Sequence, residues 1–104
     1  MFNRNSTIKY PAYTTILPFK EDPRVVVYIR KTSYIRYNLR LDLIDDPDIL
    51  VLEINNPNIK PFYIINIYNE LNINKERTIE RALLPLKLDK PTLLIGDFNS
   101  HHPL

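Results

Sequence analysis

An acid, an amide and two imidazoles follow one another near the end of the sequence. They are Asp97, Asn99, His101 and His102, and they come after the apolar run 92–95 and the single glycine of the chain. A buried strand that ends in a glycine turn and opens onto polar side chains holds reactive groups on a rigid edge. With Asp97 as a base and Asn99 as an amide that orients a phosphate or a water, the chemistry would be phosphodiester hydrolysis.

The same stretch is also compatible with ordinary turn chemistry. Glycine reaches dihedral angles that other residues avoid, and the side chains of Asp and Asn hydrogen-bond to nearby backbone groups. A motif as short as Gly96-Asp97-Phe98-Asn99 has a high false-positive rate. Its interpretation therefore depends on the rest of the chain.

Length and composition indicate one small globular domain. The chain has 104 residues, of which 44% are hydrophobic and 25% charged, a balance typical of folded proteins. A formal net charge of +2 is too small to indicate nucleic-acid binding by itself. The absence of cysteine excludes disulfides and thiolate zinc sites. No apolar run approaches the roughly 20 residues of a membrane span, and we expect an intracellular protein, nuclear or cytoplasmic, without a membrane partner.

Four stretches ahead of the motif predict β-strands. Residues 24–31 include three consecutive valines and are apolar on both faces, which predicts a central strand. Residues 34–43 alternate between apolar and polar side chains, which predicts a half-buried strand. The apolar stretches 48–54 and 60–68 are separated by Asn55-Asn56-Pro57-Asn58, a strong turn signal that predicts an antiparallel hairpin.

One amphipathic helix is expected between the last two strands. We place it near residues 75–84, with Asn74 as its cap, because Pro85 disfavours helix at the residue before it. Apolar residues recur there at helical spacing, namely Ile79, Ala82, Leu83 and Leu86. The strand 92–95 follows this crossover, so it can lie parallel to an earlier strand.

The predicted fold class is α/β with a mostly antiparallel sheet. Residues 1–23 show no clear period and predict an irregular, aromatic-containing segment. Several strands are apolar on both faces, so the chain offers more sheet surface than one helix can bury. We therefore expect a partner that covers the exposed sheet, either another chain or further parts of the same domain.

Two motifs, one on each side of the predicted helix, carry a family resemblance. Ile-Asn-Ile-Tyr ends a strand at residues 65–68, and Pro-Thr-Leu-Leu-Ile-Gly-Asp-Phe-Asn-Ser-His-His-Pro-Leu occupies residues 91–104. With the blocks at 24–31 and 46–54, they resemble the endonuclease/exonuclease/phosphatase superfamily, the deoxyribonuclease I-like group. The likeness is closest to the endonuclease domain of non-LTR retrotransposon reverse transcriptases. It covers residues 24–104 and implies part of a four-layer α/β/β/α sandwich.

The resemblance implies Mg²⁺-dependent hydrolysis of DNA phosphodiesters. By its pattern, Asp97 orients or deprotonates the attacking water, and Asn99 holds the phosphate or helps to position Asp97. Tyr68 matches the tyrosine that contacts the scissile phosphate, and packing in the core is the alternative for it. His101 and His102 match a subgroup signature, as nucleic-acid contacts or as packing within the loop.

Parts of the family pattern have no counterpart in the chain. The family's metal-binding glutamate would precede residue 24, and residues 1–23 hold no match for it. The closing Ser-Asp-His block is also missing, and Asn69 and Glu70 replace a small residue and a proline. We therefore expect a partial site, with the main metal ligands outside the chain and no activity of the chain alone. A phosphoesterase with a non-DNA substrate, and a non-catalytic remnant or interaction module, are the alternatives.

Overall fold

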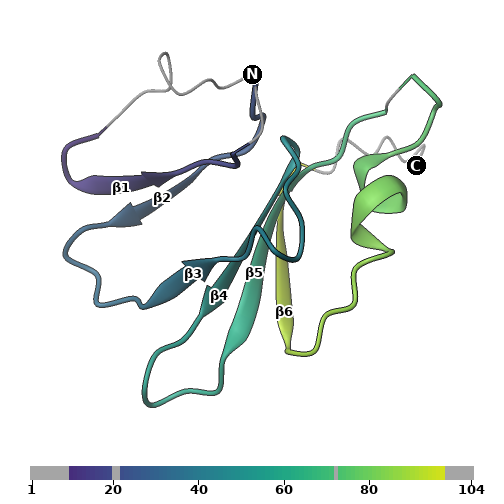
Figure 1. The fold of residues 1–104 in the computed structure, drawn as a ribbon. Coiled ribbons are helices and arrows are strands. Elements are labelled where there is room, and N and C mark those ends of the chain that lie inside the picture. Colours follow the sequence, from purple (N-terminus) through teal and green to yellow (C-terminus); the bar gives the residue numbers. More distant parts are fainter. Residues whose placement is uncertain (1–9, 20–21, 72, 98–104) are drawn as a thin grey trace, which may run out of the picture.

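The computed structural model describes residues 10–19, 22–71 and 73–97, which form six strands and one short helix (Figure 1). β1 (Tyr13–Ile16) and β2 (Val27–Arg30) pair antiparallel as a two-stranded sheet, here called the β1–β2 ribbon. The main sheet has four strands in the order β3 (Tyr37–Leu39), β4 (Ile49–Ile54), β5 (Phe62–Tyr68) and β6 (Thr92–Asp97). The helix η1 (Ile79–Leu83) lies between β5 and β6 in the chain.

β4 is an inner strand of the main sheet, and its sequence explains why. Only Glu53 among its six residues is not fully buried, as expected for a strand covered on both faces. β4 pairs antiparallel with β5, with Val51 opposite Ile65, which confirms the predicted hairpin. β6 pairs parallel with β5, which confirms the parallel strand predicted after the helical crossover.

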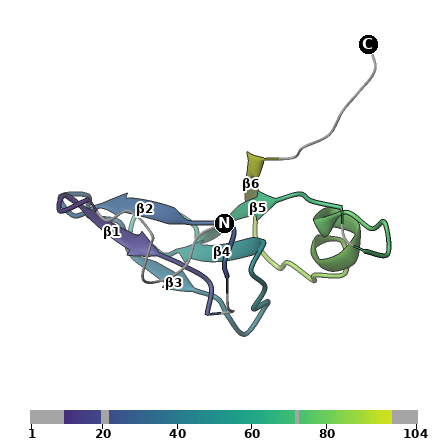
Figure 2. The same ribbon diagram turned by 90° about the horizontal axis from the view of Figure 1, so that it is seen from above.

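Two groups of buried side chains lie on opposite faces of the main sheet. On one face the β1–β2 ribbon covers the sheet, and the buried residues are Ile16, Val25, Leu50, Leu52 and Ile54. On the other face η1 covers the sheet, and the buried residues are Ile49, Val51, Tyr63, Ile65 and Ile67. Figure 2 shows the ribbon and η1 on either side of β4 and β5. The described residues thus form a small, compact, sheet-rich domain with few helices, which is compatible with the predicted α/β class.

β6 is the edge strand of the main sheet and the least covered part of it. Its side chains Leu93, Leu94 and Ile95 are 54%, 37% and 42% exposed. Leu93 is paired with Ile64 on the ribbon face, and Leu94 with Ile65 on the η1 face, so neither layer extends across β6. The prediction of a buried strand at 92–95 is therefore wrong in burial, although the strand itself is confirmed.

The N-terminal part of the chain departs from the prediction. The irregular segment predicted for residues 1–23 is wrong at Tyr13–Ile16, because these residues form β1. The strand predicted for 24–31 is shortened to β2 and pairs with β1 instead of lying at the centre of the main sheet. The backbone N–H of Arg24 donates to the carbonyl of Pro47 at 2.6 Å, outside the β1–β2 ribbon. β2 therefore begins only after this contact, at Val27.

The strand predicted for residues 34–43 is also shorter, and only β3 remains of it. Tyr34 is 95% exposed and Ile35 is 43% exposed, so the alternating pattern begins outside the sheet. After β3 the amides of Leu43 and Ile44 donate to the carbonyl of Arg40, and the chain turns there. Local backbone bonds therefore end the strand before the apolar alternation ends.

The helix predicted near residues 75–84 is reduced to η1, a π-helix of five residues. Lys75 has a φ of +60°, a left-handed conformation that no α-helix continues through. Thr78, and not Asn74, occupies the N-cap position. The amide of Leu84 donates to the carbonyl of Ile79 at 2.9 Å, the wide turn of a π-helix.

Candidate functional site

The parallel pairing of β5 with β6 brings two of the predicted site residues together along the backbone. The register places Tyr68 opposite Asp97, and each is the last residue of its strand. Adjacent parallel strands end at the same edge of a sheet. The two motifs that suggested a site in the sequence therefore meet at one sheet edge.

Gly96 determines how closely β5 and β6 approach at this edge. Its φ is +135°, a conformation that side-chain-bearing residues rarely adopt. A Cβ at this position would overlap the carbonyl oxygen of Ile67 and lie 2.8 Å from the nitrogen of Ile67. Gly96 lies inside β6, so the glycine turn predicted after the strand is wrong, and close strand contact is the reason for the glycine.

Tyr68 is half-buried and packs against the core on the ribbon face of the sheet. The Arg24 guanidinium lies over its ring, with Cζ 5.1 Å from the ring centroid, where the ring quadrupole attracts a cation. The amide of Tyr68 donates to the carbonyl of Asp48 at 2.8 Å. Tyr68 thus packs against the core with part of its ring, and its contact with a phosphate stays a prediction.

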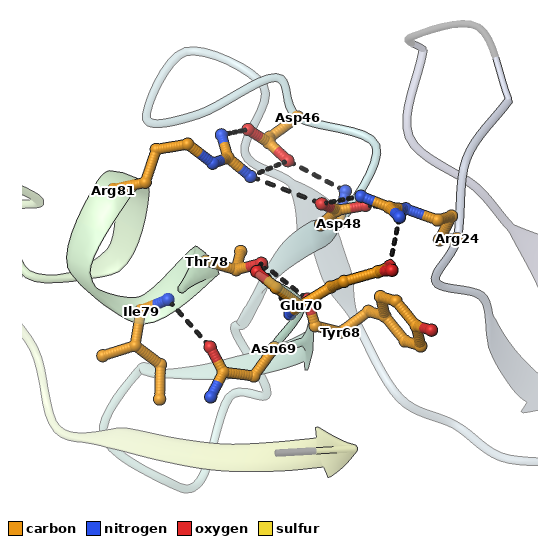
Figure 3. Close-up of polar contacts among 9 residues, drawn as sticks. All are labelled: Arg24, Asp46, Asp48, Tyr68, Asn69, Glu70, Thr78, Ile79 and Arg81. Carbon is orange, nitrogen blue, oxygen red and sulfur yellow. Dashed lines mark hydrogen bonds and ion pairs between the residues drawn. The ribbon is translucent and has the colours of Figure 1, made fainter. Parts of the chain in front are cut away.

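Arg24 connects the chain before β2 to the ends of β4 and β5 (Figure 3). Its Nε donates to Asp48 Oδ1 at 2.5 Å, its Nη2 donates to Asp48 Oδ2 at 2.5 Å, and its Nη1 donates to Glu70 Oε2. The Asp48 side chain is only 3% exposed, so this two-point ion pair lies in the interior. The hydrogen bonds to Asp48 raise the pKa of the Arg24 guanidinium, although partial burial acts in the opposite direction.

Arg81 reaches Asp48 from η1 and also pairs with Asp46 (Figure 3). Its Nη1 donates to Asp46 Oδ2 at 2.5 Å, and its Nη2 lies 3.4 Å from Asp48 Oδ2. Asp46 Oδ1 also accepts the amide of Asp48 at 2.9 Å, a short-range bond typical of an aspartate in a turn. Burial raises the pKa of Asp46, but the hydrogen bonds from Arg81 and the Asp48 amide outweigh it and hold the pKa below its ordinary value.

Thr78 and Asn69 connect the start of η1 to the end of β5. The Thr78 hydroxyl is fully buried, donates to the carbonyl of Tyr68 at 2.7 Å and accepts the amide of Glu70 at 3.1 Å. Asn69 Oδ1 accepts the amide of Ile79 at 3.2 Å, one of the first amides of the helix. Asn69, which departs from the family pattern, therefore stabilises the start of η1 in this chain.

Replacement of Thr78 by valine should lower the free energy of unfolding by about 1–3 kcal/mol, because the carbonyl of Tyr68 and the amide of Glu70 each lose a hydrogen bond. A urea titration of the purified chain measures this loss. Thr78→Ser is the matched control, since it keeps the hydroxyl and should keep most of the stability. A loss in Thr78→Val no larger than that in Thr78→Ser would show that the hydrogen bonds contribute no more than the methyl group that serine lacks.

The described residues do not form the Mg²⁺ site that the resemblance implies. No group of three or more Asp, Glu or His side chains among them is placed to hold a metal ion. Asp46, Asp48 and Glu70 lie close in space, but Arg24 and Arg81 engage all three carboxylates. Mg²⁺ requires carboxylate oxygens that are available for coordination.

The structure therefore tests only part of the predicted site. Asn99, His101 and His102 lie outside the described residues, and for Asp97 the structure gives the position at the end of β6. The predicted roles of these four residues stay predictions.

Sequence reasoning missed the ionic cluster of Arg24, Asp48 and Arg81. One signal could have found it, because Asp48 directly precedes the buried strand β4. An aspartate that is buried almost always has a charged partner. The pattern alone does not say which arginine that partner is, since both arginines are distant in the chain.

No helix among the described residues is long and apolar enough to cross a membrane. Comparison with protein-family models, with curated proteins and with solved structures found no match. The family resemblance therefore rests on the sequence motifs, chiefly those at 65–68 and 91–104.

Proposed function

We propose that this chain carries part of a phosphodiester-hydrolysing domain of the endonuclease/exonuclease/phosphatase type, with DNA nicking of the retroelement kind as the activity of the complete domain. The observation that supports it most is the parallel register of β5 and β6, with Asp97 opposite Tyr68. The two residues belong to motifs that η1 separates in the chain, and the pairing of the strands brings them to one sheet edge.

The proposed domain is a four-layer α/β/β/α sandwich. One face of the main sheet is covered by η1, as an outer layer of such a sandwich requires. The exposed apolar residues of β6, Leu93, Leu94 and Ile95, would be covered by further parts of the same domain.

In the proposed hydrolysis of a phosphodiester, three residues of the chain have separate roles. Asp97 aligns or deprotonates the attacking water, Asn99 holds the phosphate or positions Asp97, and Tyr68 contacts the scissile phosphate. Mg²⁺, when bound, stabilises charge that builds on the phosphate. Its ligands are proposed to lie outside the described residues, and His101 and His102 to contact nucleic acid or to pack within their loop.

Plasmid nicking tests this proposal. The 104-residue chain and the product of the reading frame extended on both sides are each incubated with supercoiled plasmid and Mg²⁺. We expect no nicking by the chain alone, and nicking by the extended protein that falls by about 100-fold or more in Asp97→Ala. Asp42→Ala, which removes an acid that is 64% exposed on the turn after β3, is the matched control and should not change the rate.

Three outcomes would contradict parts of the proposal. Robust nicking by the 104-residue chain, abolished by Asp97→Ala, would overturn the partial site. Nicking that survives Asp97→Ala would remove Asp97 from the site. Turnover of a small phosphodiester without DNA cleavage would favour a phosphoesterase with a non-DNA substrate.

A second candidate function is favoured by the exposure of β6. An uncovered edge strand with apolar side chains on both faces is a template for association, so the chain would be a non-catalytic interaction module. A stable complex with another chain, unchanged by Asp97→Ala, would support the module over the enzyme.

A further inference from the structure

The outer face of the β1–β2 ribbon carries aromatic and basic side chains. In the register of the ribbon, Tyr13 is opposite Arg30, and Thr15 is opposite Tyr28. Opposed residues of a paired sheet share a face, and side chains alternate along each strand, so these four residues lie on one face. The other face packs on the core through Ile16, Val27 and Ile29.

Three tyrosines gather on this outer face, and we call them the tyrosine cluster: Tyr10, Tyr13 and Tyr28. The ring centroids of Tyr10 and Tyr28 are 5.4 Å apart, and each of the other two pairs is 6.4 Å apart. Interplanar angles of 72–82° make every contact edge-to-face. Tyr10 and Tyr13 nevertheless stay 49% and 38% exposed, so part of their surface remains accessible to a ligand.

Two hollows open beside the tyrosine cluster. One, of about 310 Å³, is lined by the three tyrosines alone. The other, of about 420 Å³, shares Tyr10 and Tyr13 and is also lined by Pro11, Thr14, Thr15 and Lys31. An aromatic surface and a lysine therefore border one continuous region of the ribbon.

The stretches of chain that carry the cluster hold basic residues and no acids. Residues 10–19 and 24–41 contain no Asp or Glu, although the chain has 12 acids. Arg30 and Lys31 are exposed and form no ion pair with any residue in the described ranges. This contrasts with Arg24, Arg40 and Arg81, whose guanidinium groups are all held by carboxylates.

The tyrosine rings together with Arg30 and Lys31 indicate which class of ligand this surface can bind. Three perpendicular tyrosines could hold an alkylated ammonium group, but Arg30 and Lys31 would repel a cation and neither hollow is lined by a carboxylate. A proline-rich peptide docks on aromatic grooves, but it carries no negative charge that would pair with Arg30 and Lys31. Unpaired nucleobases stack on exposed tyrosines while their phosphates pair with Arg and Lys.

We propose that the outer face of the β1–β2 ribbon binds single-stranded nucleic acid, with bases stacked on the tyrosine cluster and phosphates paired with Arg30 and Lys31. This surface lies on the ribbon, on the other side of β3 and β4 from the sheet edge that holds Asp97 (Figure 1). Binding there does not depend on hydrolysis at that edge, so the proposal stands or falls independently of the catalytic one.

Fluorescence anisotropy of a labelled 12-nucleotide oligo(dT) with the purified 104-residue chain tests the stacking. Tyr10→Ala and Tyr13→Ala are each expected to weaken binding about tenfold or more, the usual loss for one base–aromatic stack. Tyr34→Ala is the matched control, because Tyr34 is 95% exposed and lies outside the cluster. Tyr13→Phe keeps the ring and should keep the affinity, which preserves the test if an alanine variant unfolds.

The salt dependence of the same binding tests the phosphate contacts. Lys31→Gln is expected to make the negative slope of log affinity against log salt shallower by about 0.7, the value of one contact to a single strand. Lys87→Gln, an exposed lysine after η1, should leave the slope unchanged.

Four results would overturn the proposal. They are no binding of oligo(dT), equal losses in Tyr34→Ala and Tyr13→Ala, tighter binding of a duplex of the same length, and binding of a proline-rich peptide in place of the oligonucleotide.

Discussion

Replacement of Arg24 by methionine is expected to lower the free energy of unfolding by about 3–5 kcal/mol. The guanidinium supplies both short hydrogen bonds to Asp48, whose side chain is 3% exposed. Without Arg24, the one cation left beside the Asp48 carboxylate within the described ranges is Arg81, at 3.4 Å. A buried carboxylate that loses its main partner retains the cost of desolvation and loses the compensating attraction.

The size of this loss is large for a chain of this length. Small domains are stable by about 5–15 kcal/mol, so the change removes a substantial part of the total. The melting temperature should fall by roughly 10 °C or more. Thermal unfolding followed by circular dichroism measures the shift, and urea titration gives the free energy.

Two further variants identify the cause. Arg36→Met is the matched control, because Arg36 is exposed and forms no ion pair with a residue in the described ranges. It should change stability little. Asp48→Leu removes the buried charge itself and leaves arginines that are about one-third exposed, so its loss should be smaller than that of Arg24→Met. An Arg24→Met loss no larger than that of Arg36→Met would show that the ion pair contributes nothing net.

Replacement of Gly96 by alanine is expected to detach the end of β6 from β5, at a cost of about 2–4 kcal/mol. The added Cβ meets backbone atoms of Ile67, which cannot move aside as a flexible side chain would. The φ of +135° adds conformational strain that persists even if the strands separate slightly. Because β6 is an edge strand, it can leave the sheet without unfolding β4 and β5.

Hydrogen exchange distinguishes this local opening from global unfolding. The amides of β6 should lose protection in Gly96→Ala, whereas those of β4 should keep most of theirs. Ile95→Ala, one residue earlier on the same strand and 42% exposed, is the matched control and should alter β6 much less. Unchanged protection of β6 in Gly96→Ala would show that β5 and β6 tolerate a side chain at this contact.

The parts of the fold that were predictable depend on local, repeated signals. Residues 48–54 and 60–68 combine apolar side chains with a strong turn between them, and they form β4 and β5. The helical crossover before 92–95 indicated a parallel strand, and β6 is parallel to β5. These features depend on neighbours in the chain, so a single sequence carries them.

The sequence-based predictions are wrong where contacts between residues far apart in the chain determine the local structure. Residues 24–31 are apolar enough for a central strand, but β2 pairs with β1, whose own sequence shows no strand period. The predicted helix at 75–84 loses its first turn because Lys75 takes a left-handed conformation and Thr78 bonds to the end of β5. In both cases a contact across the fold outweighed a local preference.

The sequence by itself predicted an α/β class with which the sheet-rich structure is compatible. It also determined the β4–β5 hairpin and the parallel β6, and it supplied the candidate site residues Tyr68, Asp97, Asn99, His101 and His102. Its signals are periodicity, turn residues and motif spacing, all of which act over short stretches of chain. Only the tertiary structure decided that Asp97 stands opposite Tyr68, that Gly96 is required by contact with Ile67, and that Arg24 and Arg81 converge on Asp48. These arrangements depend on strand register and on charges far apart in the chain, which become neighbours only when the sheet forms.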